Sequence, residues 1–144
     1  ADLSRFSEAT FDMIFHPVSN LFVPDINPVW QEAYRVLKPG GVLLSGFINP
    51  VIYIFDLDLM DEEKKLEVCY TIPYSDIHSP SPEKQKQFLE RGWPIEFGHS
   101  LEDQIGGQLK AGFLLTGFYE DIHPESELCK YISTFIATRA IKPG

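Results

Sequence analysis

The segment from Phe11 to Phe47 constrains the fold most, because it encodes a strand, a helix and a second strand in the order that a parallel sheet requires. Its first part, Phe11 to Phe15, is a nearly continuous apolar run, as in a strand that is covered on both faces. Between residues 26 and 37 the apolar side chains recur at the spacing of a helix that packs on one side. A second apolar run, Val42 to Leu44, follows. The segment therefore predicts a βαβ unit with a right-handed crossover.

Proline and glycine mark the two ends of the predicted helix. Asn27 followed by Pro28 suits an N-cap and the first helical position. At the other end, residues 39–41 read Pro-Gly-Gly. Proline cannot continue a helix and glycine accepts the left-handed backbone of a C-cap, so we expect the helix to stop there.

The residues of this unit resemble the class I S-adenosylmethionine-dependent methyltransferases. Phe11 and Asp12 open the first strand, and residues 32–43 read EAYRVLKPGGVL. Together they look like the fourth strand, the following helix and the fifth strand of that family, particularly of its small-molecule branch. The resemblance extends upstream to Asp2 and downstream to the C-terminal hairpin. It implies an α/β fold: a partial Rossmann-like sheet in the strand order four, five, seven, six, with flanking helices and a C-terminal antiparallel hairpin.

One motif of the family does not occur in the sequence. The family's first strand and its glycine-rich loop hold the methionine end of the cofactor, and no G-x-G-x-x-G is found between residues 1 and 144. The resemblance therefore implies that residues 1–144 are the C-terminal part of a methyltransferase domain. S-adenosylmethionine is the implied cofactor.

The resemblance also implies an adenine contact near the start of the chain. In the family, an acidic residue there meets the adenine through its carboxylate, and the next residue meets it through its backbone N–H. Asp2 and Leu3 occupy these positions. The alternative is that Asp2 is a solvated residue near a chain end.

A polar loop, His16 to Asn20, follows the first strand, at the edge where open α/β sheets bind ligands. We predict that His16 is catalytic, because an imidazole ordinarily exchanges a proton near neutral pH. The alternative is that His16 caps the strand end and bonds a backbone carbonyl. The predicted cofactor contacts in this loop are His16, Pro17 and Val18, and the predicted acceptor contacts are Ser19, Asn20 and Phe22.

Residues 49–99 form an irregular segment that is much longer than an ordinary α/β loop, and we predict that it is a substrate-lid insertion. Its apolar and aromatic residues 50–55 suit a concave pocket. Five carboxylates at residues 56–63 are expected to form a solvated acidic face, because the glycine and ligand spacing of the alternative, a calcium loop, is missing. Further predicted acceptor contacts are Asn49, Tyr53 and His99, with a structural His99 as the alternative.

The rest of the chain predicts a strand at 66–72, a helix at 82–90, a helix from Ser100, and a hairpin of strands 113–119 and 131–140. Ser100 and Asp103 suit a capping box. Leu101, Ile105 and Leu109 share one face of that helix. Glycines 106 and 107 in its interior reduce helix stability, which suggests close approach to another backbone, a ligand or the sheet.

Composition disfavours several classes of partner. With a net charge of −9 and no basic stripe, neither nucleic acid nor an acidic lipid surface is an expected partner. No apolar run approaches the roughly 20 residues that cross a bilayer. Cys69 and Cys129 lack C-x-x-C spacing and are interpreted as buried thiols of a cytoplasmic protein. No metal site is predicted.

Two functional hypotheses follow. The first is S-adenosylmethionine-dependent methyl transfer to a small-molecule acceptor, in which this chain supplies the adenine contact and the acceptor side of the site. The alternative is a truncated, non-catalytic domain that forms a homodimer through Phe11 to Phe15, because a strand without its neighbours leaves an unpaired edge. A nucleotide-binding dehydrogenase remnant is disfavoured by the antiparallel hairpin and the RVLKPGG sequence.

Overall fold

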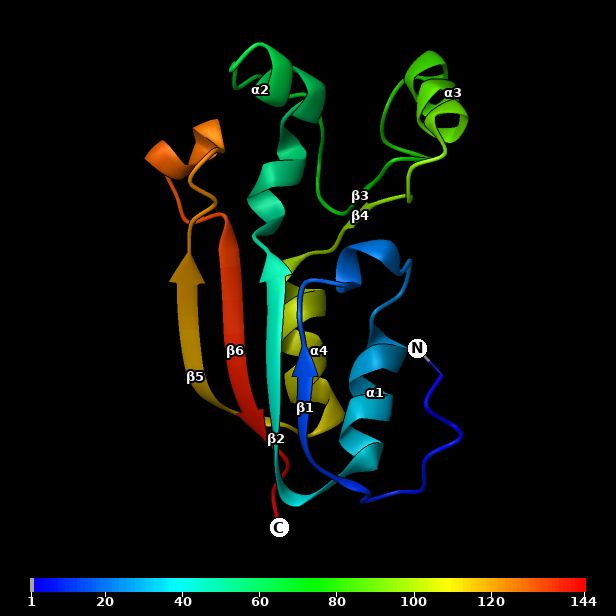
Figure 1. Cartoon of the computed structure of the whole chain (residues 1–144), viewed down its shortest axis with the longest axis vertical. Helices are drawn as coiled ribbons and strands as arrows, with labels where there is room; N and C mark the ends of the chain where they lie inside the picture. The colour runs from blue at the N-terminus through cyan, green and yellow to red at the C-terminus, as the bar shows by residue number, and fades with distance from the viewer. Residues whose placement is uncertain (1) are drawn as a thin grey trace.

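A computed structural model describes residues 2–144. Its centre is a sheet in the order β1-β2-β6-β5 (Figure 1). β1 and β2 are parallel, whereas β6 is antiparallel to both β2 and β5. The predicted α/β class and the strand order four, five, seven, six are confirmed. The strands are β1 (Phe11–His16), β2 (Leu37–Ile48), β5 (Leu114–Asp121) and β6 (Phe135–Ile141).

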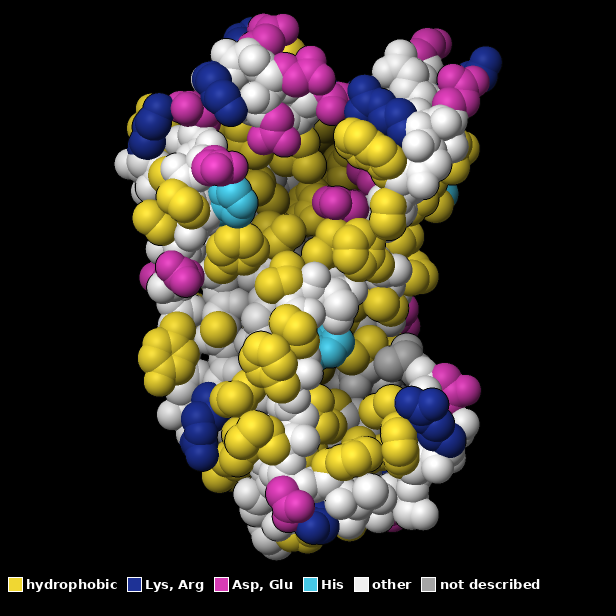
Figure 2. Space-filling model, in the orientation of Figure 1, with side chains coloured by type: hydrophobic (Ala, Val, Ile, Leu, Met, Phe, Trp, Pro, Cys, Tyr) yellow, Lys and Arg dark blue, Asp and Glu magenta, His cyan; other side chains and the backbone are white. Residues whose placement is uncertain are grey.

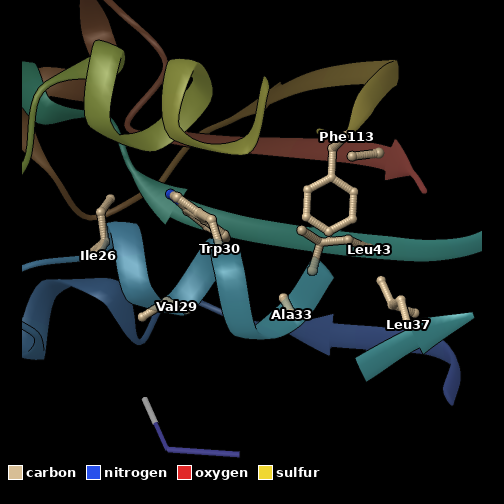
Figure 3. Close-up of a cluster of buried hydrophobic side chains, with 8 residues drawn as sticks. Ile26, Val29, Trp30, Ala33, Leu37, Leu43 and Phe113 are labelled. Carbon is tan, nitrogen blue, oxygen red and sulfur yellow. The ribbon is translucent and has the colours of Figure 1, made fainter. Parts of the chain in front are cut away.

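Two helical segments cover one face of the sheet (Figure 1). The first is α1 (Asn27–Val36), and the second is a π-helical turn, η3 (Glu102–Gly106), that continues into α4 (Gly107–Ala111). Figure 3 shows the buried side chains that gather between α1, the sheet and the strand end at Phe113. The fully or almost fully buried members of this core are Ile26, Val29, Trp30, Ala33, Leu37, Leu43, Phe113 and Ala140.

The first helix is shorter than predicted. It ends at Val36, and β2 begins at Leu37, so residues 39–41 belong to the start of β2 rather than to a helix cap. The residue before a proline avoids helical backbone, which excludes Lys38 from the helix. Gly40 has a φ of 77°, the left-handed backbone that glycine adopts without strain.

The second helical segment buries a neighbouring face rather than the one predicted. Leu101 and Leu109, expected on its packed face, are 47% and 51% exposed, whereas Gln104 and Gln108 are 4% and 0% exposed. A Cβ on Gly107 would lie 2.5 Å from Cδ1 of Trp30, so the glycine permits close packing on α1. Gly107 therefore serves packing against the Trp30 side chain of α1, which was not among the alternatives of another backbone, a ligand or the sheet, and Gly106 has no such close neighbour.

The other face of the sheet carries no helix in the part of the chain that the structure describes (Figure 1). Met13 and Phe15 of β1 are 58% and 72% exposed there. An apolar hollow of about 600 Å³ lies on this face, between the β1–β2 end and β5, and Figure 2 shows apolar side chains along it. Within the described residues, β1 pairs only with β2, so its outer edge is unpaired.

The predicted lid lies beyond the ends of β1 and β2 (Figure 1). The expected strand at 66–72 is wrong, because only a single bridge between Phe55 and Val68 forms there. The helix predicted at 82–90 is present as α3. We call residues 49–99 the lid, although its closing over a site stays a prediction. Its elements are η2 (Pro50–Ile54), α2 (Leu57–Glu62), β3 (Tyr74–Ser75), α3 (Pro82–Arg91) and β4 (Phe97–Gly98). Two further short helices are η1 (Asn20–Phe22) and η4 (Glu127–Lys130).

Two global features complete the description. Cys69 is exposed and Cys129 is partly exposed, and both are free thiols, so the expectation that they are buried is wrong. Among residues 2–144, none of the helices combines the length and the apolar character that crossing a bilayer requires.

Candidate functional site

The predicted loop after β1 folds back so that its polar side chains meet. His16 Nε2 lies 2.6 Å from Asn20 Oδ1 and 3.4 Å from Ser19 Oγ. The imidazole packs edge-on against Trp30, with ring centroids 5.8 Å apart. His16 therefore stays half-buried at the carboxyl end of β1, held by side chains on two sides.

Asn20 continues this cluster into the protein. It is 1% exposed, and its Nδ2 donates to Gln104 Oε1 at 2.8 Å. Gln108, one turn further along the helix, donates from Nε2 to the Gln104 carbonyl and accepts from Thr138 Oγ1. A line of side-chain hydrogen bonds thus joins the loop after β1 to the buried face of η3 and α4.

His99 has the surroundings of a structural histidine. It is 8% exposed, and its Nε2 lies 2.8 Å from the Val23 carbonyl and 3.1 Å from the Asn20 carbonyl. A ring N–H donates into these two acceptors, which ties the end of the lid to η1. The geometry favours the structural alternative, and a contact between His99 and the acceptor stays a prediction.

Asn49 and Tyr53 support the lid from within. Asn49 accepts from the Val51 N–H and donates to the Ser133 carbonyl at 2.8 Å. Tyr53 is 3% exposed, stacks on Tyr74 and donates its hydroxyl to Glu96 at 3.0 Å. Burial and the Glu96 carboxylate raise the pKa of the Tyr53 hydroxyl, so it remains a donor. Both residues shape the lid, and their contact with an acceptor stays a prediction.

Two carboxylates that the sequence did not single out lie in this region. Asp76 accepts from the Tyr74 hydroxyl and from the Glu96 N–H, each at 2.8 Å. Burial raises the pKa of Glu96, and the Asp76 charge adds to that effect, although the Tyr53 hydrogen bond opposes it. The pairing of β3 with β4 brings these carboxylates together across 20 sequence positions.

Asp76 and Glu96 line a hollow of about 280 Å³ between α2 and α3. Figure 2 shows apolar side chains around the hollow, with acidic side chains among them. Phe22, a predicted acceptor contact, lies in the wall together with two basic side chains of α3. Its aromatic walls are formed by Phe22, Tyr74, Phe88 and Trp93.

Within the lid, helix α3 is held against the start of α2 mainly by ion pairs. None of its residues is buried, whereas Lys84 Nζ lies 2.7 Å from Asp56 and 3.0 Å from Asp58. Burial opposes the charge of Asp56, but the hydrogen bonds from Lys84, the Leu59 N–H and Tyr70, together with the Lys84 charge, outweigh it and lower the pKa of that carboxyl. The expected solvated acidic face is therefore wrong for Asp56 and Asp58, which are ion-paired.

Replacing Lys84 with methionine should loosen α3 without unfolding the sheet. The change leaves two partly buried carboxylates without their lysine, and removing one partner of such a pair is costly. Amides of residues 82–91 should exchange hydrogen about tenfold faster, while those of β2 and β6 keep their rates. Lys86→Met is the matched control, because the Lys86 side chain is 77% exposed and its single ion pair within residues 2–144 is with Glu90. Equal effects of the two variants would show that the ion pairs do not hold α3.

The predicted adenine contact is only partly available. Asp2 is exposed, and hydrogen bonds from Ser4 lower the pKa of its carboxyl. The Leu3 N–H, however, donates to Glu32 Oε2 at 3.2 Å. Arg35 holds the same segment through the Leu3 and Phe6 carbonyls. The segment that follows Asp2 is thus anchored to α1, with the carboxylate pointing to solvent.

No metal centre is found in the described part of the chain, since residues 2–144 contain no group of three or more His, Cys, Asp or Glu side chains that could hold an ion.

Comparisons with known proteins find methyltransferases. A family model described as a methyltransferase domain matches residues 1–45. The uncharacterized methyltransferase YbaJ of Bacillus subtilis is 51% identical over 141 residues, which is 98% of this chain and 54% of the relative. The chain therefore spans about half the length of this curated relative.

Solved structures of low sequence identity share the fold. An S-adenosylmethionine-dependent methyltransferase from Mesorhizobium loti superposes with a TM-score of 0.62 at 15% identity, covering 99% of this chain and 68% of that one. A SAM-dependent methyltransferase from Methanosarcina mazei gives 0.61 at 17% identity, covering 99% and 63%.

Proposed function

We propose that this chain, a member of the class I S-adenosylmethionine-dependent methyltransferases, supplies the acceptor side of a site for methyl transfer to a small molecule. The observation that carries the proposal is the polar cluster of His16, Ser19 and Asn20 at the carboxyl end of β1, from which η1 leads to Phe22 in the wall of the aromatic hollow. Open α/β sheets bind ligands at this edge.

Of the two residues expected to contact the adenine of the cofactor, one is available for that contact in the structure. The exposed Asp2 carboxylate is free to accept from an adenine amino group, whereas the Leu3 N–H is engaged by Glu32. Asp2 and the loop of His16, Pro17 and Val18 would hold the cofactor, which when bound supplies an electrophilic methyl group. Of the predicted adenine pair, the geometry therefore favours Asp2 over the backbone of Leu3.

The chain's own residues would orient the acceptor, exclude water and remove a proton. Displacement at a methyl carbon is accelerated mainly by alignment of the two reactants. His16 would take the proton from an acceptor group that must lose one, while the lid, residues 49–99, would cover the site. A hollow of about 280 Å³ with acidic walls suits a small molecule and disfavours nucleic acid.

Binding of S-adenosylmethionine to the full-length protein tests the proposal directly. Asp2→Asn should weaken binding about tenfold, because a charge-assisted hydrogen bond to the adenine amino group becomes a neutral one. Asp12→Asn is the control, since Asp12 is an exposed carboxylate paired with Lys38. Titration calorimetry measures the affinity of the wild type and of both variants for S-adenosylmethionine. NAD is titrated separately, as the ligand that a dehydrogenase-like domain would bind. Absence of S-adenosylmethionine binding, or binding of NAD instead, would overturn the proposal.

The unpaired edge of β1 supports a second proposal, a homodimer in which Phe11 to Phe15 of two copies pair. Exposed Met13 and Phe15 lie beside that edge. Sedimentation equilibrium should then find a dimer that Phe15→Lys dissociates. A monomeric full-length protein would contradict the proposed homodimer and would not bear on the proposed methyl transfer.

A further inference from the structure

We propose that Asn20 and Gln104 are positioning residues that hold the His16 imidazole in the tautomer protonated at Nε2, which leaves Nδ1 as the proton acceptor. The assignment of the acceptor nitrogen to catalysis rests on the proposed function. The tautomer itself follows from the hydrogen bonds and does not depend on methyl transfer.

The direction of the hydrogen bonds determines which imidazole nitrogen of His16 carries the hydrogen. Asn20 donates from Nδ2 to Gln104 Oε1 at 2.8 Å, so its carbonyl oxygen is the atom that faces His16. An amide oxygen only accepts, and it lies 2.6 Å from Nε2, so Nε2 carries the hydrogen. Among residues 2–144, no hydrogen bond to Nδ1 is found, which leaves its lone pair available.

The π-helical turn places Gln104 where Asn20 can reach it. The Gly107 N–H donates to the Glu102 carbonyl, one residue further back than in an α-helix. Trp30 pins this turn to α1 by donating from Nε1 to the Asp103 carbonyl at 3.0 Å. Turns of this kind occur frequently at functional sites. Gln104 is thus held on the buried face, although its sequence neighbours Leu101 and Leu109 are more apolar.

Two buried glutamines are unusual in a helix that packs on a sheet, because a buried amide destabilises a fold unless it is hydrogen-bonded. The Gln108 amide is satisfied by structural hydrogen bonds, since it accepts from Thr138 and donates to the helix backbone. Gln104 instead directs its carbonyl oxygen to Asn20. A Gln104 without that role could be replaced by a leucine of similar size, so its polarity points to orientation of the Asn20 amide.

The orientation of the Asn20 amide decides which nitrogen of His16 accepts a proton, because a neutral imidazole has one donor and one acceptor nitrogen. If the Asn20 amide were reversed, its Nδ2 would donate to His16 Nε2, and the ring hydrogen would move to Nδ1. The nitrogen that accepts a proton would then face the protein interior. Gln104 prevents this reversal by accepting the hydrogen bond from Asn20.

The test is imidazole nitrogen NMR of the full-length protein labelled with ¹⁵N-histidine. In the wild type, His16 should show the Nε2-protonated tautomer with a slowly exchanging Nε2 proton. Gln104→Met should produce a mixture of tautomers and speed that exchange about tenfold. Gln104→Glu keeps an acceptor for Asn20 and should retain the wild-type tautomer.

Gln108→Met is the matched control, because Gln108 lies on the same buried helix face and does not touch Asn20. It should leave the His16 signals unchanged. The proposal is overturned if His16 of the wild type is protonated at Nδ1, or if Gln104→Met and Gln108→Met give the same His16 spectrum. The wild-type spectrum decides the first point even if a variant fails to fold. These spectra require no methyl transfer, so absence of cofactor binding would overturn the proposed function alone.

Discussion

Replacing Trp30 with alanine is expected to lower the free energy of unfolding by about 3–5 kcal/mol. Trp30 is 0% exposed and occupies the space between α1 and the π-helical turn, where a Cβ on Gly107 would already collide with it. Its removal opens a cavity and leaves the buried Asp103 carbonyl without the indole donor. Urea-induced unfolding followed by circular dichroism measures the loss.

Trp93→Ala is the control, because Trp93 is the other tryptophan and is 66% exposed. It packs against the Arg91 guanidinium, 5.3 Å from its ring centroid. Its substitution should change the free energy of unfolding by about 0.5 kcal/mol or less. Similar losses for both variants would contradict the placement of the core between α1 and the sheet.

The same substitution tests whether the core and the candidate site are coupled. Trp30 supports the His16 ring edge-on and also pins the turn that carries Gln104. A Trp30→Ala variant that still folds should therefore lose the single His16 tautomer as well as stability. The sequence alone would not suggest this link, because residues 16, 30 and 104 are far apart along the chain.

The sheet could be predicted because its signals are local. The strand at Phe11, the helix from Asn27 and the strand ending in Ile48 each show their own apolar period, and the RVLKPGG residues resemble one family. The capping box is local too: Ser100 Oγ accepts from the Asp103 N–H, and Asp103 accepts in return. Features that depend on three or four neighbouring residues are thus readable in the sequence.

The ion pairs within residues 49–99 and the buried amides could not be predicted, because distant contacts decide them. Asp56 is ion-paired only because Lys84, 28 positions away, reaches it. Apolar periodicity selected Leu101 and Leu109 as the packed face of their helix, whereas Gly107 allows Trp30 to approach a different face. The signal that was missed is the pair of glutamines four residues apart beside that glycine.

His16→Gln is expected to reduce kcat of the full-length enzyme by about 10²- to 10⁴-fold while weakening S-adenosylmethionine binding much less, because Asp2, Pro17 and Val18 keep their proposed cofactor contacts. A glutamine side chain can place its Nε2–H where the imidazole Nε2–H lies, so the hydrogen bond to Asn20 Oδ1 is kept. What is lost is the second ring nitrogen, the only group at this position that accepts a proton. The loss should therefore appear in kcat rather than in cofactor affinity.

The measurement is steady-state kinetics with a small-molecule acceptor that the wild type methylates, alongside cofactor titration. His78→Gln serves as the matched control, because His78 is an exposed histidine on the lid. It should keep its kcat within about twofold, as expected of a surface substitution away from the site. If His16→Gln keeps wild-type kcat, the acceptor needs no base at this position, and catalysis rests on alignment alone. If cofactor binding is lost together with kcat, His16 holds the cofactor, and the proton must leave by another group.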